Sequence, residues 1–371
     1  MNASVAVTGF DVPDGVYLLS HSVGCLPRDA EAVLSERFFK PWREQGGNAW
    51  PGWLGEIERF RGAIARLIGG TAAGVCPTAN VAGAVARILD ALPPRAGRTT
   101  LLLCEEDFPS PAYAVQRAGQ LGHGVRFLPR GPAAEDVATW DAAFDGRVQA
   151  ALVTHAFSNR SARLPVAEIT RLARSRGIFT IVDAVQSAGV VPIDVGDWSA
   201  DFVVGTCVKF LCGGPGAGWM WAAPVALAVS QPRDVGWFSH ADPFAMDVRD
   251  FRYAPDALRF WGGTPSVAPF ILAAHALEVL LGIGVPAIQQ HNQDLIDRLH
   301  AAVPAGTIAS ALDRERRGNC VLVRVPETTA AMQRLVEAGI LADARDGCVR
   351  VSPHLYSSAT DIDRLVAALA F

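Results

Sequence analysis

Residues 182–221, VDAVQSAGVVPIDVGDWSADFVVGTCVKFLCGGPGAGWMW, contain the two charged side chains on which the fold assignment depends, Asp183 and Lys209. Each follows an apolar run with the length of a buried strand, and the two residues are 26 positions apart. This spacing allows one strand, a crossover and the next strand of a parallel sheet. Both side chains are therefore predicted at the same edge of an open α/β sheet, which is where such sheets bind ligands.

Lys209 is an unusual residue in this chain. Only two of the 33 basic residues are lysines, Lys40 and Lys209, so nearly every positive charge is an arginine. Burying an ammonium group is costly unless the group is paired or loses its proton. A neutral amine can attack a carbonyl, which a guanidinium cannot do. We therefore interpret Lys209 as a reactive amine with an aldehyde partner.

The composition excludes several classes of function. The chain has 371 residues, of which 50% are hydrophobic and 19% are charged, and a net charge of -4, as expected for a compact folded protein. It has no basic patch for nucleic acid, no apolar run long enough to span a membrane and no signal-peptide pattern at its start. Its seven cysteines show neither zinc-ligand spacing nor a disulfide framework. We expect a cytoplasmic protein with no metal, nucleic-acid or membrane partner.

From about residue 70, short apolar runs alternate with longer amphipathic ones, which predicts an α/β fold with a mostly parallel sheet. Strands are expected at 99–107, 125–129, 148–157, 178–185, 200–206 and 216–222, and helices at 78–92, 110–122 and 165–177.

The pattern changes towards the C-terminus. Two long helical patterns, 267–284 and 288–303, precede shorter strand and helix patterns at 319–325, 329–340, 348–352 and 361–370. We therefore expect a large cofactor-binding domain at 45–260. Residues 1–44 and 261–371 are expected to form an N-terminal arm and a small α+β domain.

Pyridoxal 5'-phosphate (PLP) explains the residues around Lys209. This cofactor needs a lysine for its aldehyde, a carboxylate to keep its ring nitrogen protonated and a cradle for its phosphate. Asp183 offers the carboxylate, Thr78 a hydroxyl at a helix N-terminus, Thr206 a further hydroxyl and Phe108 an aromatic face for the ring. Taken singly, each of these is more often a cap, turn or core residue, so only their joint occurrence favours the cofactor.

The same motifs resemble the class V aminotransferase group of fold-type I PLP enzymes, and within it the kynureninases. The resemblance covers nearly the whole chain. It is carried by residues 182–221 and by YLLSHSVGCLP (17–27), EEDFPSPAYAVQ (105–116), DVGWFSHADPFAMD (234–247), RFWGGTP (259–265) and CVRVSPHLYSS (348–358).

The resemblance implies a role for each matching residue of the cofactor site. Lys209 would form the Schiff base and move the proton at Cα, Asp183 would pair with the ring nitrogen, and Phe108 would stack on the ring. The remaining cofactor contacts would come from Thr78, Ala79, Gln186, Thr206, Trp237 and Thr264, the last from the partner subunit of a homodimer with a shared active site.

For the amino-acid substrate, the resemblance implies that Arg350 grips the α-carboxylate. A guanidinium suits this task because it donates two parallel hydrogen bonds to a carboxylate. Asn48, in the segment GGNAW, and His21 match further substrate positions.

Four positions depart from the kynureninase pattern. His21 replaces the asparagine of the N-terminal signature, and Asn48 stands where kynureninases carry the histidine of a Gly-His pair. Gln186 stands where kynureninases usually have histidine and is more similar to the cysteine desulfurase branch, while Val208 replaces the tyrosine usually found before the lysine.

Three functions therefore stay open. The first is a kynureninase-like hydrolase or lyase, in which water adds to the substrate's side-chain carbonyl and the Cβ–Cγ bond breaks to leave alanine. The second is a cysteine desulfurase, C–S lyase or class V aminotransferase, with Cys348 as the nearest candidate thiol. The third is a binding protein that keeps the fold without turnover.

Overall fold

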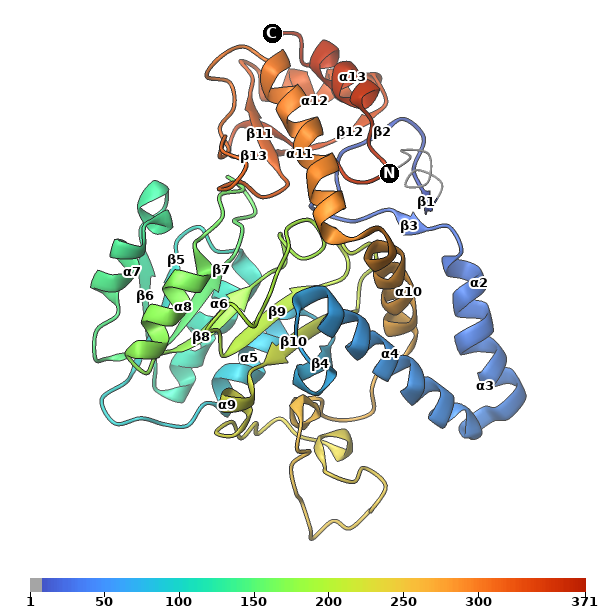
Figure 1. Ribbon diagram of the computed structural model, residues 1–371, viewed down its shortest axis with the longest axis vertical. Coiled ribbons are helices and arrows are strands. Elements are labelled where there is room, and N and C mark those ends of the chain that lie inside the picture. Colours follow the sequence, from blue (N-terminus) through green and yellow to red (C-terminus); the bar gives the residue numbers. More distant parts are fainter. Residues whose placement is uncertain (1–8) are drawn as a thin grey trace.

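A seven-stranded sheet forms the centre of the protein. The computed structural model describes residues 9–371, and the sheet is flanked by helices (Figure 1). β10 is antiparallel to both of its neighbours, and the remaining strand pairs are parallel, so the predicted α/β class is confirmed. The strand order is β4 (Val75–Thr78), β10 (Gly218–Ala222), β9 (Phe202–Thr206), β8 (Phe179–Asp183), β7 (Val148–Thr154), β5 (Thr100–Cys104) and β6 (Gly124–Leu128).

The inner strands are mostly apolar because both faces of the sheet are covered. Every residue of β7, β8 and β10 is buried. Gly205 of β9 lies directly opposite Trp219 of β10, and a Cβ atom at Gly205 would lie 2.2 Å from the indole ring. Glycine at this position therefore lets the buried Trp219 pack next to the end of β9.

The predicted helices are present, but the helix predicted to begin at residue 78, next to the expected cofactor site, begins later. α5 (Val81–Ala91) begins after Asn80, whose side chain accepts a hydrogen bond from Gly83 N at 2.8 Å. Thr78 is instead the last residue of β4, so the expected helix start at residue 78 is wrong by about one turn. A proline at the start and a glycine after the end bound α8 (Val166–Ser175), as predicted. The shorter helices of this region are α6 (Pro109–Arg117), α7 (Val137–Ala143) and α9 (Pro224–Leu227).

An arm precedes the sheet, and its helices were not predicted from the sequence. It comprises α2 (Ala30–Leu34), a short π-helical turn, α3 (Lys40–Gln45) and α4 (Trp50–Ile68). α4 packs against α10 (Ala268–Ile283), where the rings of Phe60 and Phe270 lie 4.9 Å apart.

A second, smaller sheet lies above the first (Figure 1). Its order is β11 (Val321–Arg324), β14 (Cys348–Val351) and β13 (Asp343–Arg345), all antiparallel. The N-terminal strand β2 (Val16–Tyr17) pairs in parallel with β12 (Ile340–Leu341), and β1 (Phe10–Asp11) pairs with β3 (Leu26–Pro27). Helices α11 (Val285–Ala302), α12 (Thr328–Glu337) and α13 (Ala359–Leu369) complete this unit.

Two hydrophobic cores divide the chain at α11. Its first turn, with Val285 and Ile288, belongs to the large core, together with α10. Its later residues, including Leu295 and Leu299, belong to the core of the small unit. We therefore propose that the boundary between the two units lies within α11, later in the chain than the expected residue 261.

Within residues 9–371, no single helix is long and apolar enough to span a membrane. α10 and α11 meet that criterion only as a pair, and they are bent by 78° at their junction.

Candidate active site

Lys209 lies in a tight loop between β9 and β10. The loop is closed by hydrogen bonds from Cys207 N to Ala217 O and from Gly213 N to Cys207 O, at 2.8 and 2.7 Å. Gly24 N donates to Val208 O at 2.8 Å, which ties the N-terminal segment to the residue beside the lysine. The loop glycines do not line the pocket that Lys209 enters, so their role is to form the turn rather than to approach a cofactor.

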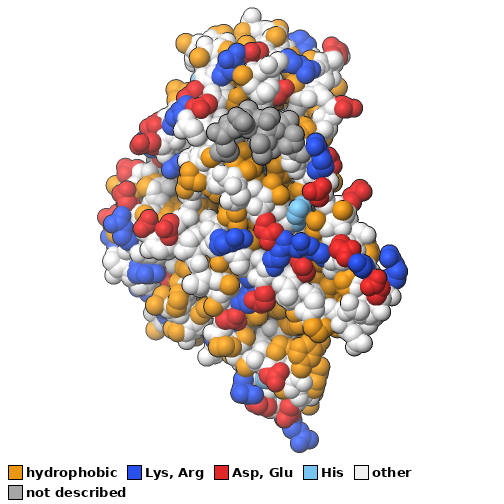
Figure 2. Space-filling view, turned by 45° about the vertical axis from the view of Figure 1, so that its right-hand side comes forward, with side chains coloured by type: hydrophobic (Ala, Val, Ile, Leu, Met, Phe, Trp, Pro, Cys, Tyr) orange, Lys and Arg blue, Asp and Glu red, His pale blue; other side chains and the backbone are white. Residues whose placement is uncertain are grey.

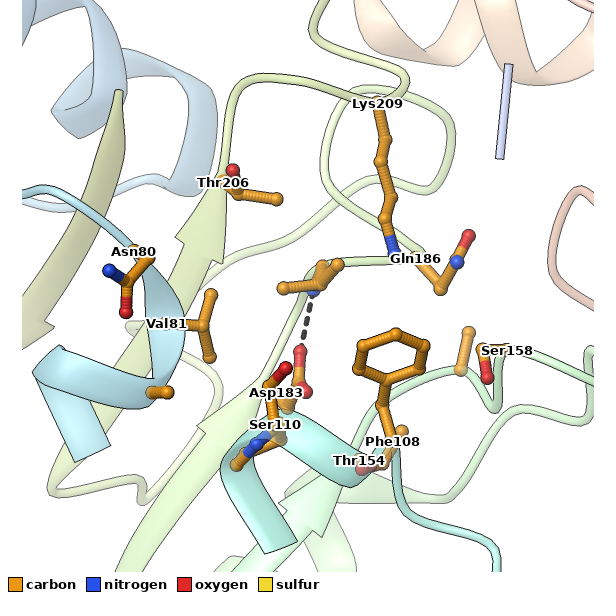
Figure 3. Close-up of a pocket in the computed structure, with 14 residues that line it drawn as sticks. Asn80, Val81, Phe108, Ser110, Thr154, Ser158, Asp183, Gln186, Thr206 and Lys209 are labelled. Atoms are coloured by element: carbon orange, nitrogen blue, oxygen red, sulfur yellow. Dashed lines mark hydrogen bonds between the residues drawn. The ribbon is translucent and has the colours of Figure 1, made fainter. Parts of the chain in front are cut away.

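The Lys209 side chain points into a pocket of about 220 Å³ at the carboxyl edge of the large sheet (Figure 3). Its Nζ lies over the Phe108 ring, 5.0 Å from the ring centroid. Asp183, at the end of β8, and Thr206, at the end of β9, line the same pocket, as the sequence predicted. The other lining residues are Asn80, Val81, Ala82, Ser110, Pro111, Thr154, Ala156, Ser158, Val185 and Gln186.

Asp183 is a buried carboxylate with an incomplete set of partners. Its Oδ1 accepts a hydrogen bond from Val185 N at 2.8 Å, and Oδ2 accepts none from the residues that the structure describes. Burial raises the pKa of Asp183, while the Val185 N–H and the charge of Lys209 oppose this shift. A cationic group beside Oδ2 would offset the cost of burying the charge.

Lys209 is similarly desolvated. Burial lowers the pKa of its amine below the ordinary 10.5, and the charge of Asp183 opposes part of this shift. Among residues 9–371, no carboxylate lies within ion-pair distance of its Nζ. The amine is therefore deprotonated at a lower pH than that of an ordinary lysine, which favours attack on a carbonyl.

The N-terminus of α5 faces the same pocket as Lys209. Asn80, Val81 and Ala82 line the pocket, and the first backbone N–H groups of a helix together with its dipole favour a negative charge. Thr78 and Ala79 instead line a neighbouring pocket on the other side of Asn80. The phosphate cradle expected at this helix stays a prediction, and the residue that caps the helix is Asn80 rather than Thr78.

These residues fit PLP. The cofactor presents an aldehyde, a ring nitrogen that needs a carboxylate, a planar face and a phosphate. The pocket offers a desolvated amine, a carboxylate with one free oxygen, the Phe108 ring and a helix N-terminus, all from separate elements around one cavity. Lys209, Asp183, Phe108 and the start of α5 could therefore hold it.

Gln186 lies at the pocket edge and is held by its neighbours. Its Nε2 donates to His21 O at 3.2 Å, and its Oε1 is 3.9 Å from the Cys320 thiol. The side chain is thus oriented by the N-terminal segment and by the small unit.

Two expected substrate residues, Arg350 and His21, lie behind the pocket wall. Arg350 donates to Ser158 O at 2.8 Å, and Ser158 lines the pocket. His21 is buried, and both of its ring nitrogens have partners, Ser352 and Asp343. Because no nitrogen is left for a ligand, His21 is not placed to bind substrate directly in this structure.

Three other expected residues gather on a different face of the chain. Asn48 is exposed in a short turn before α4, and Trp237 Nε1 donates to Thr264 Oγ1 at 3.3 Å. None of the three lines the Lys209 pocket.

The sequence did not predict several polar pocket neighbours, among them Ser110, Thr154, Ser158 and Asp107. Thr154 Oγ1 donates to Asp107 at 2.6 Å, and burial raises the pKa of Asp107 to about 7. The signal available for Thr154 was its place at the end of a buried strand, next to Asp183 in the register of β7 and β8. In residues 9–371, no group of three or more His, Cys, Asp or Glu side chains could hold a metal ion.

The lowered pKa of Lys209 predicts the pH dependence of cofactor attachment. Only the neutral amine reacts with the aldehyde. When PLP is added to apoenzyme, the rate of the absorbance increase at ~420 nm should therefore rise with pH and level off, and the midpoint of this rise should lie below pH 10.5. A lysine peptide measured in parallel corrects for ionisation of the aldehyde itself. Asp183→Asn should move the midpoint to lower pH because it removes the charge that stabilises the ammonium. A midpoint at or above 10.5 would contradict the buried setting of the amine.

Comparison with known proteins agrees with this geometry. The family model described as aminotransferase class-V matches residues 54–365. A kynureninase from Deinococcus radiodurans is 31% identical over 97% of this chain and 91% of its own length. An isopenicillin N epimerase from Streptomyces clavuligerus is 28% identical over 83% of this chain and 82% of its own length.

Among solved structures, a mutant of the cystine C–S lyase C-DES, with glycine covalently linked to its PLP cofactor, superposes with a TM-score of 0.86. It is 22% identical and covers 96% of this chain and 97% of its own. At this identity the likeness shows the fold, which is that of the fold-type I PLP enzymes. The chain belongs to the class V aminotransferase family of PLP-dependent enzymes, as a kynureninase-like member.

Proposed function

We propose that this PLP enzyme is a kynureninase-like hydrolase that cleaves a side-chain bond of kynurenine or a related β-substituted L-amino acid. The observation that carries the proposal is the pocket that Lys209, Asp183 and Phe108 share, in a chain similar to a kynureninase over 97% of its length. The cofactor, when bound, supplies an aldehyde for the amine and a ring that accepts the electrons left behind when a substrate proton departs.

The residues of the pocket divide the work. Lys209 would hold the cofactor through its amine and, as a free amine, would move the proton at the substrate's Cα. Asp183 keeps the ring nitrogen protonated through its free oxygen, and Phe108 orients the ring from one side. The start of α5 binds the phosphate, with Thr206 beside the lysine loop.

Arg350 binds the substrate's α-carboxylate from behind Ser158. Its donors are charged and nearly buried, so a hydrogen bond from them to a carboxylate is stronger than one in water. This places Cα of the substrate between Arg350 and Lys209.

A second copy of the chain completes the site. Asn48, Trp237 and Thr264 lie away from the Lys209 pocket, on a face with a chain of aromatic contacts that links the N-terminal arm to the 237–244 loop. The rings in contact are Phe38, Phe39, Trp42, Trp50, Trp53, Trp237, Phe238 and Phe244.

The loop after Trp237 carries exposed apolar side chains among charged ones, and its Phe244 is 54% exposed and its Val248 98% exposed. Figure 2 shows hydrophobic side chains together with charged ones on the projection at the bottom of the molecule. An exposed apolar patch of this kind marks an interface. In a homodimer it would bring Trp237, Thr264 and aromatic rings to the partner's pocket, which suits an aromatic substrate.

The departures at Gln186 and Val208 leave C–S bond cleavage as the second candidate. All seven cysteines are buried, and burial raises the pKa of Cys348, whose Sγ faces Asp346 O in an ordered strand. A desulfurase that needs a mobile reactive thiol is therefore disfavoured. A C–S lyase without a thiol nucleophile fits the pocket better.

The substrate test compares three amino acids with one enzyme preparation. Incubation with L-kynurenine should release fluorescent anthranilate and alanine, and Lys209→Ala should abolish the release. L-cystine and L-cysteine serve as the competing substrates and are assayed for sulfide after addition of a thiol, which reduces the persulfide formed from cystine to sulfide. Release of sulfide without anthranilate would contradict the kynureninase proposal and support C–S cleavage. The absence of any product, or of cofactor absorbance, would contradict both proposed activities.

The dimer makes a separate prediction. Light scattering should give twice the mass of one chain, and Val248→Asp should shift the protein to monomer because it places a charge in the apolar interface. Its cofactor affinity should fall, since the partner's Trp237 and Thr264 are withdrawn. Val336→Asp, at a 72% exposed position on α12, is the matched control and should change neither property. A Val248→Asp protein that stays dimeric with full cofactor affinity would contradict the shared site.

A further inference from the structure

Arg350 is already paired with a carboxylate of its own chain. Its Nε donates to Asp343 Oδ1 at 2.9 Å and its Nη2 to Asp343 Oδ2 at 2.5 Å, which is the two-bond geometry that a substrate carboxylate would also use. The two residues lie directly opposite each other in the register of β13 and β14, so their side chains share one face of the hairpin. This pairing is therefore built into the backbone of the small sheet.

The remaining donors of Arg350 point to how a substrate would bind. A guanidinium has five N–H groups, and three of them donate to Asp343 and to Ser158 O. One N–H on Nη1 and one on Nη2 remain without a partner among the described residues. Asp343 thus occupies the edge that contains Nε and leaves donors on the two terminal nitrogens.

His21 fixes Asp343 from the other side. Burial lowers the pKa of the His21 ring below its ordinary 6.5, so the ring is neutral at pH 7. Its Nε2 lies 3.1 Å from Asp343 Oδ1 and must carry the hydrogen, while Nδ1 accepts from the Ser352 hydroxyl at 2.8 Å. The hairpin is also held near its turn, where Asn159 Nδ2 donates to Asp346 at 3.3 Å.

We propose that Asp343 is a positioning residue that holds Arg350 by its Nε edge, so that only the terminal nitrogens receive the α-carboxylate of the substrate. His21 supports this arrangement by orienting Asp343, which gives a physical role to a histidine that does not face the pocket. The inference rests on the proposed role of Arg350 in binding that carboxylate.

The net charge of the Asp343–Arg350 pair distinguishes a positioning role of Asp343 from a purely electrostatic one. The Asp343–Arg350 pair has no net charge, so a second carboxylate gains little from long-range attraction and must be held by directed hydrogen bonds. If Asp343 only diluted the charge of Arg350, its removal would strengthen carboxylate binding. If it positions Arg350, its removal should weaken binding because the guanidinium turns to find a new acceptor.

The test compares two ligands that differ in the carboxylate. L-alanine and ethylamine are titrated into the holoenzyme, and binding is followed by the change in cofactor absorbance. Asp343→Asn should weaken L-alanine binding by about tenfold and change ethylamine binding by less than about twofold, the size expected for the loss of oriented charge-assisted hydrogen bonds. Asp343→Glu should restore part of the loss. L-alanine binding that is unchanged or tighter in Asp343→Asn, or an equal loss for both ligands, would overturn the proposal.

Further variants separate this inference from the proposed function and from a folding defect. Arg350→Gln should weaken L-alanine but not ethylamine; if it does not, the role of Arg350 itself is wrong. If Asp343→Asn does not fold, His21→Phe, which removes the donor to Asp343, should give the same ligand-selective loss at a smaller size, and unchanged selectivity would count against the proposal. Asp363→Asn, which breaks an exposed pair with Arg298 on the same unit, is the charge-matched control and should leave both ligands unaffected.

Discussion

The desolvation of one amine is the constraint on which the active site depends. Lys209 lies over the Phe108 ring, without a carboxylate at ion-pair distance among the described residues. Burial lowers the pKa of this amine, so it loses its proton at a lower pH than an ordinary lysine and can then react with an aldehyde. Burial also raises the pKa of Asp183, and a bound cationic ring would offset the cost of burying this carboxylate.

The sheet topology brings these groups together. β8 and β9 are parallel neighbours, so Asp183 at the end of one strand and the loop after the other open into the same cavity. The antiparallel strand β10 then lets the chain turn back in a short loop, and the Gly24 segment packs on that loop. The small unit contributes Arg350 from above, held by a carboxylate from its own hairpin. The large unit therefore supplies Lys209 and Asp183, and the small unit supplies Arg350.

Local patterns in the sequence predicted most strands and helices of residues 99–222. They also identified Lys209, Asp183, Phe108 and Thr206 as candidates for one site, and these four residues line the same pocket. These local patterns did not predict contacts between residues that are distant in the sequence. β4 is a four-residue strand that contains Pro77, so it carries no periodic signal, and the cap at Asn80 was consequently assigned to Thr78. The pairing of Asp343 with Arg350 depends on a cross-strand register that only the hairpin defines. Asn48, Trp237 and Thr264 were predicted by resemblance, but a single chain does not bring them to the pocket.

The most direct test of the account is to locate the cofactor by chemistry. The holoenzyme is reduced with borohydride, digested, and the peptide that carries the cofactor mass is identified by mass spectrometry. The chain offers only two lysines, and Lys40 is an exposed residue paired with Glu36. The account predicts stoichiometric modification of Lys209 and none of Lys40. Modification of Lys40 alone, or of neither lysine, would contradict it.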